Sequence, residues 1–234
     1  MQRRQFNHAA LALLASAAGW PLGPALAQGV AGLGADDAQA GIRAALSAGA
    51  QVAVSQLGQG GGFLNNPKVR IPLPGVLADA APLLKATGQG KRLDALELAM
   101  NQAAEQAVPL AADLLKRTIA QLSLADAHRI LTGGDTSVTD FFAVKTREPL
   151  SVQFLPVVKK ATDGVQLADK YDAVAGRAAK LGLMKQEDAN LTAYVTNKAL
   201  DGLYAVIADE ERKIRQNPAQ AGSALLQKVF GALR

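Results

Sequence analysis

A row of polar side chains on one predicted helix is the first candidate for chemistry. In the segment LDALELAMNQAAEQA, acids and an amide follow one another at steps of three, four and four, which places them on one helical face. Carboxylate and amide oxygens grouped in this way can bind a cation or a cationic ligand. The plainer interpretation is a solvated face opposite an apolar one. The residues of this polar stripe are Asp94, Glu97, Asn101 and Glu105.

Residues 60–74, GGGFLNNPKVRIPLP, form a second candidate, which we call the strap. Its three prolines and its glycine run exclude a helix and favour an extended chain. Because Val69, Ile71 and Leu73 alternate with other residues, one side is predicted to lie on the core. Such a loop either covers the core or acts as a lid or binding edge. Its candidate binding residues, of which the two basic ones are expected to face outward, are Asn65, Asn66, Lys68 and Arg70.

A third candidate lies in TNKALDGLY, where Lys198 and Asp201 are separated by one helical turn. Gly202 follows in the middle of the same predicted helix, where Gly costs about 1 kcal/mol relative to Ala. The expected reason is the close approach of a neighbouring helix. Further along, two pairs of opposite charge at i and i+4 predict ordinary helix support. They are Asp209 with Lys213 and Glu211 with Arg215.

Several kinds of catalytic and metal site are disfavoured by composition. The chain has no Cys, so disulfides, thiolate zinc sites and Cys nucleophiles are excluded. His8 and His128 are the only histidines, too few for a His-based zinc site, and His128 is expected on a helix surface.

The glycine-rich stretch 88–91 is too short for a phosphate-binding loop. In DTSVTD, Asp135 or Thr136 is expected to cap the following helix rather than to bind calcium. Metal and cofactor stay unassigned.

The N-terminus predicts export. Residues 1–27 combine a basic start, an apolar run, helix breakers and a final Ala-Leu-Ala, which is typical of a signal peptide cleaved after Ala27. The pair Arg3-Arg4 resembles a twin-arginine signal, and the general secretory route stays open as an alternative. Residues 28–36 are expected to form a flexible tether. The mature protein is therefore expected in a bacterial periplasm or outside the cell.

Charge and hydropathy limit the classes of partner that the protein is expected to bind. The chain has 25 Lys and Arg against 20 Asp and Glu, a net charge of +5, which falls to +3 when the two arginines of the leader are removed. This small excess, with aromatic residues at 4%, argues against nucleic acid as a partner. Nothing after the leader is apolar enough for a transmembrane anchor.

The remaining pattern predicts an all-α protein. We expect a single-domain bundle of about eight or nine helices over residues 37–234, with the strap as one long extended Pro-containing loop. Ser123 and Asp126 resemble a variant capping box, and Pro149 and Pro156 are expected to break or kink their region. The helices are expected at about 37–57, 75–86, 91–107, 109–122, after Ser123, from 136, at 165–181, 188–215 and after Pro218.

Five blocks of the sequence resemble an exported bacterial family known as domain of unknown function 4197, from about Ile42 to Gly231. They are SQLGQGGGFLNNPKVRIPLP, ELAMNQAAEQAVP, ILTGGDTSVTDFF, FLPVVKK and VTNKALDGLYAVIADEERKIRQNP. The resemblance implies an exported, largely helical protein in which the strap and the polar stripe are family features. It supplies no activity, cofactor or catalytic residue. The glycine run before Phe63 and the Ala-rich DAVAGRAAKLG depart from the pattern.

The leading functional hypothesis is a non-enzymatic periplasmic protein that binds a small ligand or a protein partner through the strap and the polar stripe. One alternative is a carrier of an apolar ligand or lipid, which requires an internal cavity between Ala-rich helices. Another is a hydrolase that uses only carboxylates, which requires two of them facing each other across a cleft. Identity of the ligand or partner and oligomeric state stay open.

Overall fold

The computed structural model describes residues 35–131, 133–163 and 190–218, with a few single positions between 168 and 180 and between 224 and 229. All regular structure in these residues is helical, which confirms the all-α class. The helices are α2 (Ala35–Leu57), α3 (Gly75–Ala86), α4 (Gly90–Ala107), the 3-10 turn η1 (Val108–Leu110), α5 (Ala111–Ala120), α6 (Leu124–Leu131), α7 (Ser137–Thr162) and α9 (Leu191–Gln216).

Three expectations lie partly or wholly outside this description. They are the leader with its tether, most of the helix expected at 165–181, and most of the helix expected after Pro218. The count of eight or nine helices therefore stays a prediction. The side chain of His128 is also outside the described part, although its backbone belongs to α6.

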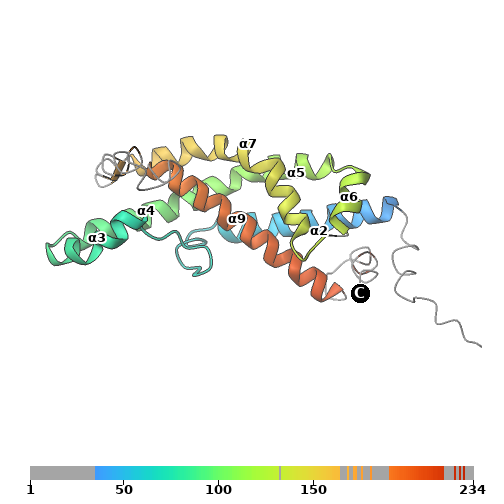
Figure 1. Cartoon of the computed structure of the whole chain (residues 1–234), viewed down its shortest axis with the longest axis horizontal. Coiled ribbons are helices and arrows are strands. Elements are labelled where there is room, and N and C mark those ends of the chain that lie inside the picture. The colour runs from blue at the N-terminus through green and yellow to red at the C-terminus, as the bar shows by residue number, and fades with distance from the viewer. Residues whose placement is uncertain are drawn as a thin grey trace, which may run out of the picture.

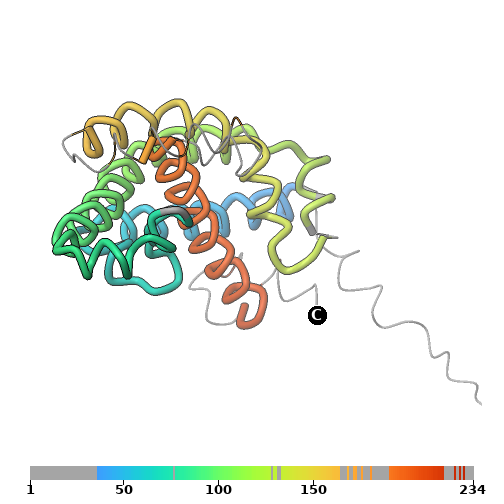
Figure 2. The backbone as a smooth tube through the Cα atoms, turned by 60° about the vertical axis from the view of Figure 1, so that its left-hand side comes forward, coloured from blue at the N-terminus to red at the C-terminus, as the bar shows by residue number. Residues whose placement is uncertain are grey.

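Helix α9 organises the bundle by crossing the other long helices. It packs against α7 and α2, and α7 also packs against α4 (Figure 1). Helix α3 pairs with α4 at one end of the molecule, and the strap loops between α2 and α3 beside α9 (Figure 2). Because α9 lies next to α7, α2 and α4, it can position side chains from segments far apart in the sequence.

Small residues allow the helices to approach closely. Ala103, Ala104 and Ala107 of α4 are fully buried, as are Ala53 of α2 and Ala199 of α9. Larger apolar side chains fill the remaining space, each buried group contributing on the order of 1.5–3 kcal/mol. The fully buried ones with the largest volumes are Tyr171, Phe63, Phe142, Phe154, Ile42, Leu46, Leu57, Ile71, Leu93, Leu96 and Met100.

The cap expected for α6 is confirmed, but the one expected for α7 is wrong. Ser123 Oγ accepts from Asp126 N at 3.1 Å and donates to Asp126 Oδ2 at 2.6 Å. Neither Asp135 nor Thr136 caps α7 through its side chain. Its first N–H groups are satisfied by Glu211 instead.

Glu211 of α9 is buried and acts as the cap of α7 from a distance in sequence. Its carboxylate accepts from Val138 N at 3.1 Å and from Thr139 N at 2.9 Å. Arg215 Nε donates to the same carboxylate at 2.9 Å, so the predicted pair is present, but it is buried rather than a surface support. A negative charge beside the helix N-terminus is favourable because the first N–H groups point at it.

Helix α7 is continuous through Pro149 and Pro156, so of the expected break or kink the break is wrong, and the kink stays a prediction. Each proline removes one N–H and leaves the carbonyl four residues earlier without its helical partner. Both prolines are exposed, so water can satisfy those carbonyls. The opposite face, with Leu150, Phe154 and Val158 fully buried, holds the helix against the core.

The neighbour of Gly202 is the strap, not another helix. A Cβ on Gly202 would lie 2.6 Å from Phe63 Cε1 and 3.3 Å from Val69 Cβ. Phe63 is fully buried, so its ring cannot move into solvent to make room. The glycine thus sets how closely the strap approaches α9.

Of the helices in the described residues, none combines the length and apolar character needed to cross a membrane.

Candidate functional site

The polar stripe of α4 binds the strap. Glu105 Oε1 accepts from Phe63 N at 3.0 Å and from Leu64 N at 3.2 Å. Asn101 Oδ1 accepts from Ile71 N at 2.9 Å, and Asn101 Nδ2 donates to Ile71 O at 2.9 Å. With the bond from Arg70 Nε to Glu97 Oε1 at 2.9 Å, five hydrogen bonds join the two segments.

Two members of the stripe are therefore not part of a solvated face. Asn101 and Glu105 are buried, and their polar atoms satisfy backbone groups that would otherwise be orphaned. Glu97 is half-buried and Asp94 is exposed. Among the described residues, no group of three or more acidic or histidine side chains is placed to hold a metal ion. The stripe acts as the anchor of the strap.

Two further bonds attach the strap to α9. Lys68 Nζ lies 2.9 Å from Asp209 Oδ2, and Tyr194 Oη donates to Pro72 O at 3.2 Å. Val69 and Ile71 are buried, whereas Lys68 and Arg70 are exposed. The strap consequently lies between α4 and α9, with its exposed side chains directed outward.

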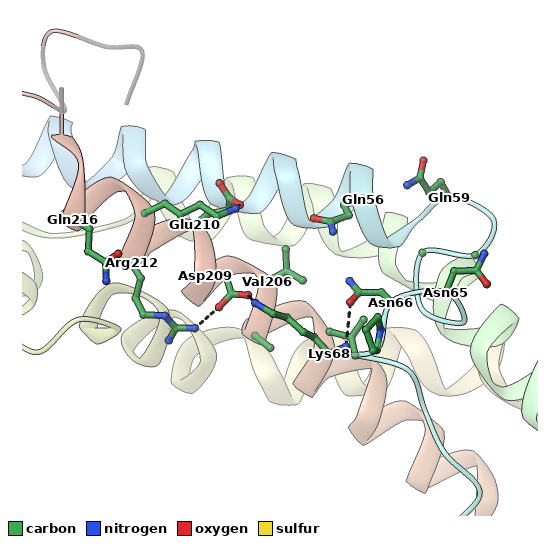
Figure 3. A pocket seen from close by; sticks show the side chains of 16 residues that line it. Gln56, Gln59, Asn65, Asn66, Lys68, Val206, Asp209, Glu210, Arg212 and Gln216 are labelled. Carbon is green, nitrogen blue, oxygen red and sulfur yellow. Dashed lines mark hydrogen bonds and ion pairs between the residues drawn. The ribbon is translucent and has the colours of Figure 1, made fainter. Parts of the chain in front are cut away.

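A groove of about 1010 Å³ opens where the strap, the end of α2 and the second half of α9 meet. Figure 3 shows Gln56 and Gln59 from the α2 side, Asn65, Asn66 and Lys68 from the strap, and Asp209, Glu210, Arg212 and Gln216 from α9. The volume lies at the upper end of the range for small-molecule sites. The other lining residues are Gly61, Gly62, Pro67, Val69, Ala205, Val206 and Lys213.

Asp209 is the electrostatic centre of this groove. Its carboxylate accepts from Lys68 on one oxygen and from Arg212 on the other. The hydrogen bond from Lys68 lowers the pKa of Asp209 below its ordinary value, with Arg212 acting in the same direction and burial opposing both. Lys213 Nζ pairs with Glu210 at 2.5 Å, so the expected pair of Lys213 with Asp209 is wrong. Asp209 pairs with Lys68 instead of Lys213, because the strap brings Lys68 next to α9.

Amide side chains make up most of the uncharged polar lining. Asn66 Oδ1 accepts from Lys68 N at 3.1 Å and shapes the turn of the strap. Within the described residues, no intramolecular hydrogen bond engages the amides of Gln56, Gln59, Asn65 and Gln216. Each offers two N–H donors and one carbonyl acceptor to a molecule in the groove.

The candidates Lys198 and Asp201 lie apart from the groove. Asp201 Oδ1 accepts from Arg147 of α7 at 2.5 Å, and Lys198 Nζ is 3.9 Å from Asp201 Oδ2. Lys198 also lies over the ring of Tyr194, 5.8 Å from its centroid. The side chains of Arg147, Lys198 and Asp201 are 42–49% exposed to solvent, and the pair of Arg147 with Asp201 links α7 to α9. The structure does not bring them together with the strap residues.

Sequence reasoning missed the α2 and α9 sides of the groove. Gln56 and Gln59 end a predicted helix just before the strap, and their position beside a glycine-rich turn was a usable signal. Asp209 and Arg212 are one turn apart and look like ordinary helix support. Their place in the groove becomes visible only in the structure, where Lys68 of the strap pairs with Asp209.

A second, smaller hollow of about 420 Å³ lies between α2 and α5. Ala50, Val54, Leu115 and Ile119 provide its apolar lining. The other residues around it are Ser47, Gln51, Ser55, Ala112 and Lys116.

Comparison with known proteins gives one match. A family model described as "Protein of unknown function (DUF4197)" matches residues 32–231, which confirms the resemblance inferred from the sequence blocks. No curated protein and no solved structure matches the chain.

Proposed function

The chain belongs to this family, and we propose that it is an exported, periplasmic, non-enzymatic protein that binds a ligand or partner in the groove between α2, the strap and α9. The observation that carries the proposal is the groove itself, with free amides on all three sides and Asp209 paired with both Lys68 and Arg212 at its centre. The stripe on α4 contributes indirectly, since it holds the strap in position.

The strap suits a preformed binding edge better than a moving lid. Its backbone N–H groups at Phe63, Leu64 and Ile71 are bonded to α4, and those at Val69 and Arg70 are bonded to Asn66 O. A segment held at so many points loses little further entropy when a ligand binds, which favours affinity.

Export is proposed from the leader. The basic start, apolar run and Ala25-Leu26-Ala27 pattern predict cleavage after Ala27 and delivery to the periplasm. Cleavage after Ala27 would leave the helical domain intact, because its first described helix, α2, begins at Ala35.

The geometry gives the carboxylate-based hydrolase less support. Such an enzyme needs two carboxyl groups free to act on one bond. Glu105 accepts two backbone N–H groups and Glu97 accepts from Arg70, so both candidates are engaged with the strap. Asp209 is held between two cations in the same way.

The apolar-carrier alternative has one observation in its favour, the hollow between α2 and α5. Its volume of about 420 Å³ and its aliphatic lining suit a small apolar ligand. It opens at the surface between two helices, whereas the carrier hypothesis expected an internal cavity.

Two matched variants distinguish the two hollows. Ala205 lines the groove and Ala112 lines the α2–α5 hollow; both are exposed and both lie in helices. The wild type, Ala205→Trp and Ala112→Trp are exported from a bacterial host and weighed under native and denaturing conditions. We expect a mass excess in the wild type and in Ala112→Trp that disappears on denaturation and is missing in Ala205→Trp.

Other results contradict the proposal. Loss of the excess only in Ala112→Trp would favour the apolar carrier, and an excess retained in Ala205→Trp would place the ligand elsewhere. A clean mass in all three proteins would argue against a tightly held ligand. The denatured mass also reports whether residues 1–27 are removed.

A further inference from the structure

The lining of the groove has the donor and acceptor pattern that suits a peptide backbone. The side-chain amides of Gln59, Asn65 and Gln216 carry the same N–H and C=O groups as a peptide unit, so each can pair with one through a donated and an accepted bond. They come from three different segments, with Gln59 and Asn65 near one end of the groove and Gln216 at the other (Figure 3). Amides in such a distribution can follow an extended chain rather than surround a single small ion.

The same lining disfavours a polysaccharide. Sugar rings are commonly held by aromatic side chains stacked on their apolar faces, and none of the sixteen lining residues is aromatic. The apolar lining consists of small or aliphatic groups, such as Ala205 and Val206. These suit short side chains of a peptide.

The charges of the groove favour an acidic group in that peptide. Asp209 alone faces two cations, Lys68 and Arg212, so one positive charge is left uncompensated, while Glu210 and Lys213 neutralise each other. The side chains of Lys68 and Arg212 are 74% and 41% exposed. Lys has three donors and Arg has five, so both keep N–H groups free for a second carboxylate.

We propose that the groove binds an extended peptide segment with an acidic side chain placed against Lys68 and Arg212. This inference rests on the proposed function, because it names the occupant of the same groove. The amides hold the peptide backbone, and the uncompensated charge selects the acidic residue. An acidic side chain adds charge-assisted hydrogen bonds there, whereas a basic one meets two like charges.

The test uses three pools of acetylated, amidated nonapeptides with eight randomised positions and Glu, Gln or Lys fixed at the centre. The whole exported protein, without its leader, is mixed with each pool at low salt, and the retained peptides are quantified by mass spectrometry after size separation. We expect the Glu pool to be retained about tenfold more than the Lys pool, with the Gln pool between them. Raising the salt concentration should reduce the difference.

Three variants separate groove binding from nonspecific attraction. Arg212→Gln should reduce the preference for Glu over Gln while peptides are still retained. Lys116→Gln, which removes an exposed cation beside the α2–α5 hollow, should leave the preference unchanged. Ala205→Trp should abolish retention of all three pools. Acetyl-glutamate-amide serves as a small probe, and it should compete poorly if the peptide backbone is also bound.

Each contrary outcome has a distinct meaning. Equal retention of the three pools, or a preference for Glu that survives Arg212→Gln, overturns the acidic specificity. No retention of any pool, with a native ligand still excluded by Ala205→Trp, overturns the peptide but leaves the groove as the binding site. A native ligand that is excluded by Ala205→Trp and identified as a saccharide also overturns the peptide and leaves the groove as the binding site. A native ligand unaffected by Ala205→Trp overturns the proposed function itself.

Discussion

Asn101 of α4 bonds to both backbone groups of Ile71, accepting from its N–H and donating to its carbonyl, each at 2.9 Å. One side chain thus takes the role that a neighbouring β-strand would have for this residue of the strap. The contact is buried, so water does not substitute for it. Through these two bonds and those of Glu105, α4 fixes the strap, and other side chains of the strap form one wall of the groove.

Replacing Asn101 by Leu should destabilise the protein strongly. The change leaves the N–H and C=O of Ile71 buried without partners, at about 1–3 kcal/mol for each group. We expect a loss of about 2–5 kcal/mol in the free energy of unfolding, measured in urea. Gln102→Leu, at the exposed neighbouring position, is the control and should change stability by less than about 0.5 kcal/mol. Equal effects would show that the bonds to Ile71 contribute nothing measurable.

The carboxylates of Glu105 and Glu97 should differ in their contribution to stability. Glu105→Gln weakens two charge-assisted bonds, a buried one to Phe63 and a part-buried one to Leu64, and we expect a cost of about 1–3 kcal/mol. Glu97→Gln affects a partly exposed pair with Arg70 and should cost less than about 1 kcal/mol. Urea unfolding of the two variants under identical conditions gives the comparison. A larger effect at Glu97 would contradict the assignment of Glu105 as the main anchor.

Gly202→Ala should destabilise the protein although Ala is the better helix former. The added methyl group would overlap the ring of Phe63, and we expect a net loss of about 1–3 kcal/mol despite a helix-propensity gain of roughly 1 kcal/mol. In a Phe63→Leu background the same substitution should be close to neutral or stabilising. A double-mutant cycle of thermal or urea unfolding measures this coupling, and additive effects would show that Phe63 is not the limiting neighbour.

Glu211→Gln should be among the most destabilising conservative changes on α9. It removes the buried partner of Arg215 and weakens the cap of α7, for which we expect about 3–5 kcal/mol. Glu210→Gln, next along the helix, affects only the pair with Lys213 and should cost less than about 1 kcal/mol. Hydrogen exchange should show increased opening at Val138 and Thr139 in the first variant alone.

The bonds of Asp209 should make a small, pH-dependent contribution to stability. Because Lys68 and Arg212 lower the pKa of Asp209 in the folded state, the unfolded chain binds the proton more readily between the two pKa values. The contribution is therefore complete above the unfolded pKa of about 3.9 and is lost as the pH falls through the lower folded value. For a pair this exposed we expect less than about 1 kcal/mol.

The matched comparison for this prediction is Asp209→Asn. The difference in unfolding free energy between the wild type and this variant should be constant from about pH 7 to pH 5 and should decline below about pH 4. A carbon-detected NMR titration of the Asp209 carboxyl group checks the direction of the pKa shift independently. A difference that grows on acidification would contradict the assigned role of Lys68 and Arg212.

Local signals in the sequence predicted several elements well. The spacing of apolar residues indicated helices close to the observed α3 and α4, and the pair Ser123 and Asp126 indicated the start of α6. These features depend on residues only three or four positions apart, so that a single sequence contains what is needed. Predictions that depended on distant partners were less successful. The cap of α7 and the neighbour of Gly202 both come from other segments.

By itself, the sequence determined the helical class, the non-helical strap, the placement of the four stripe residues on one helical face, and the absence of any Cys chemistry. Only the tertiary structure decided what the stripe binds, because a helical face records which side chains lie together and not what lies against them. It also decided that Lys68 meets Asp209 across 141 positions of sequence. Such a contact depends on how α2, α4 and α9 pack, and that packing is set by the whole core rather than by residues near either partner.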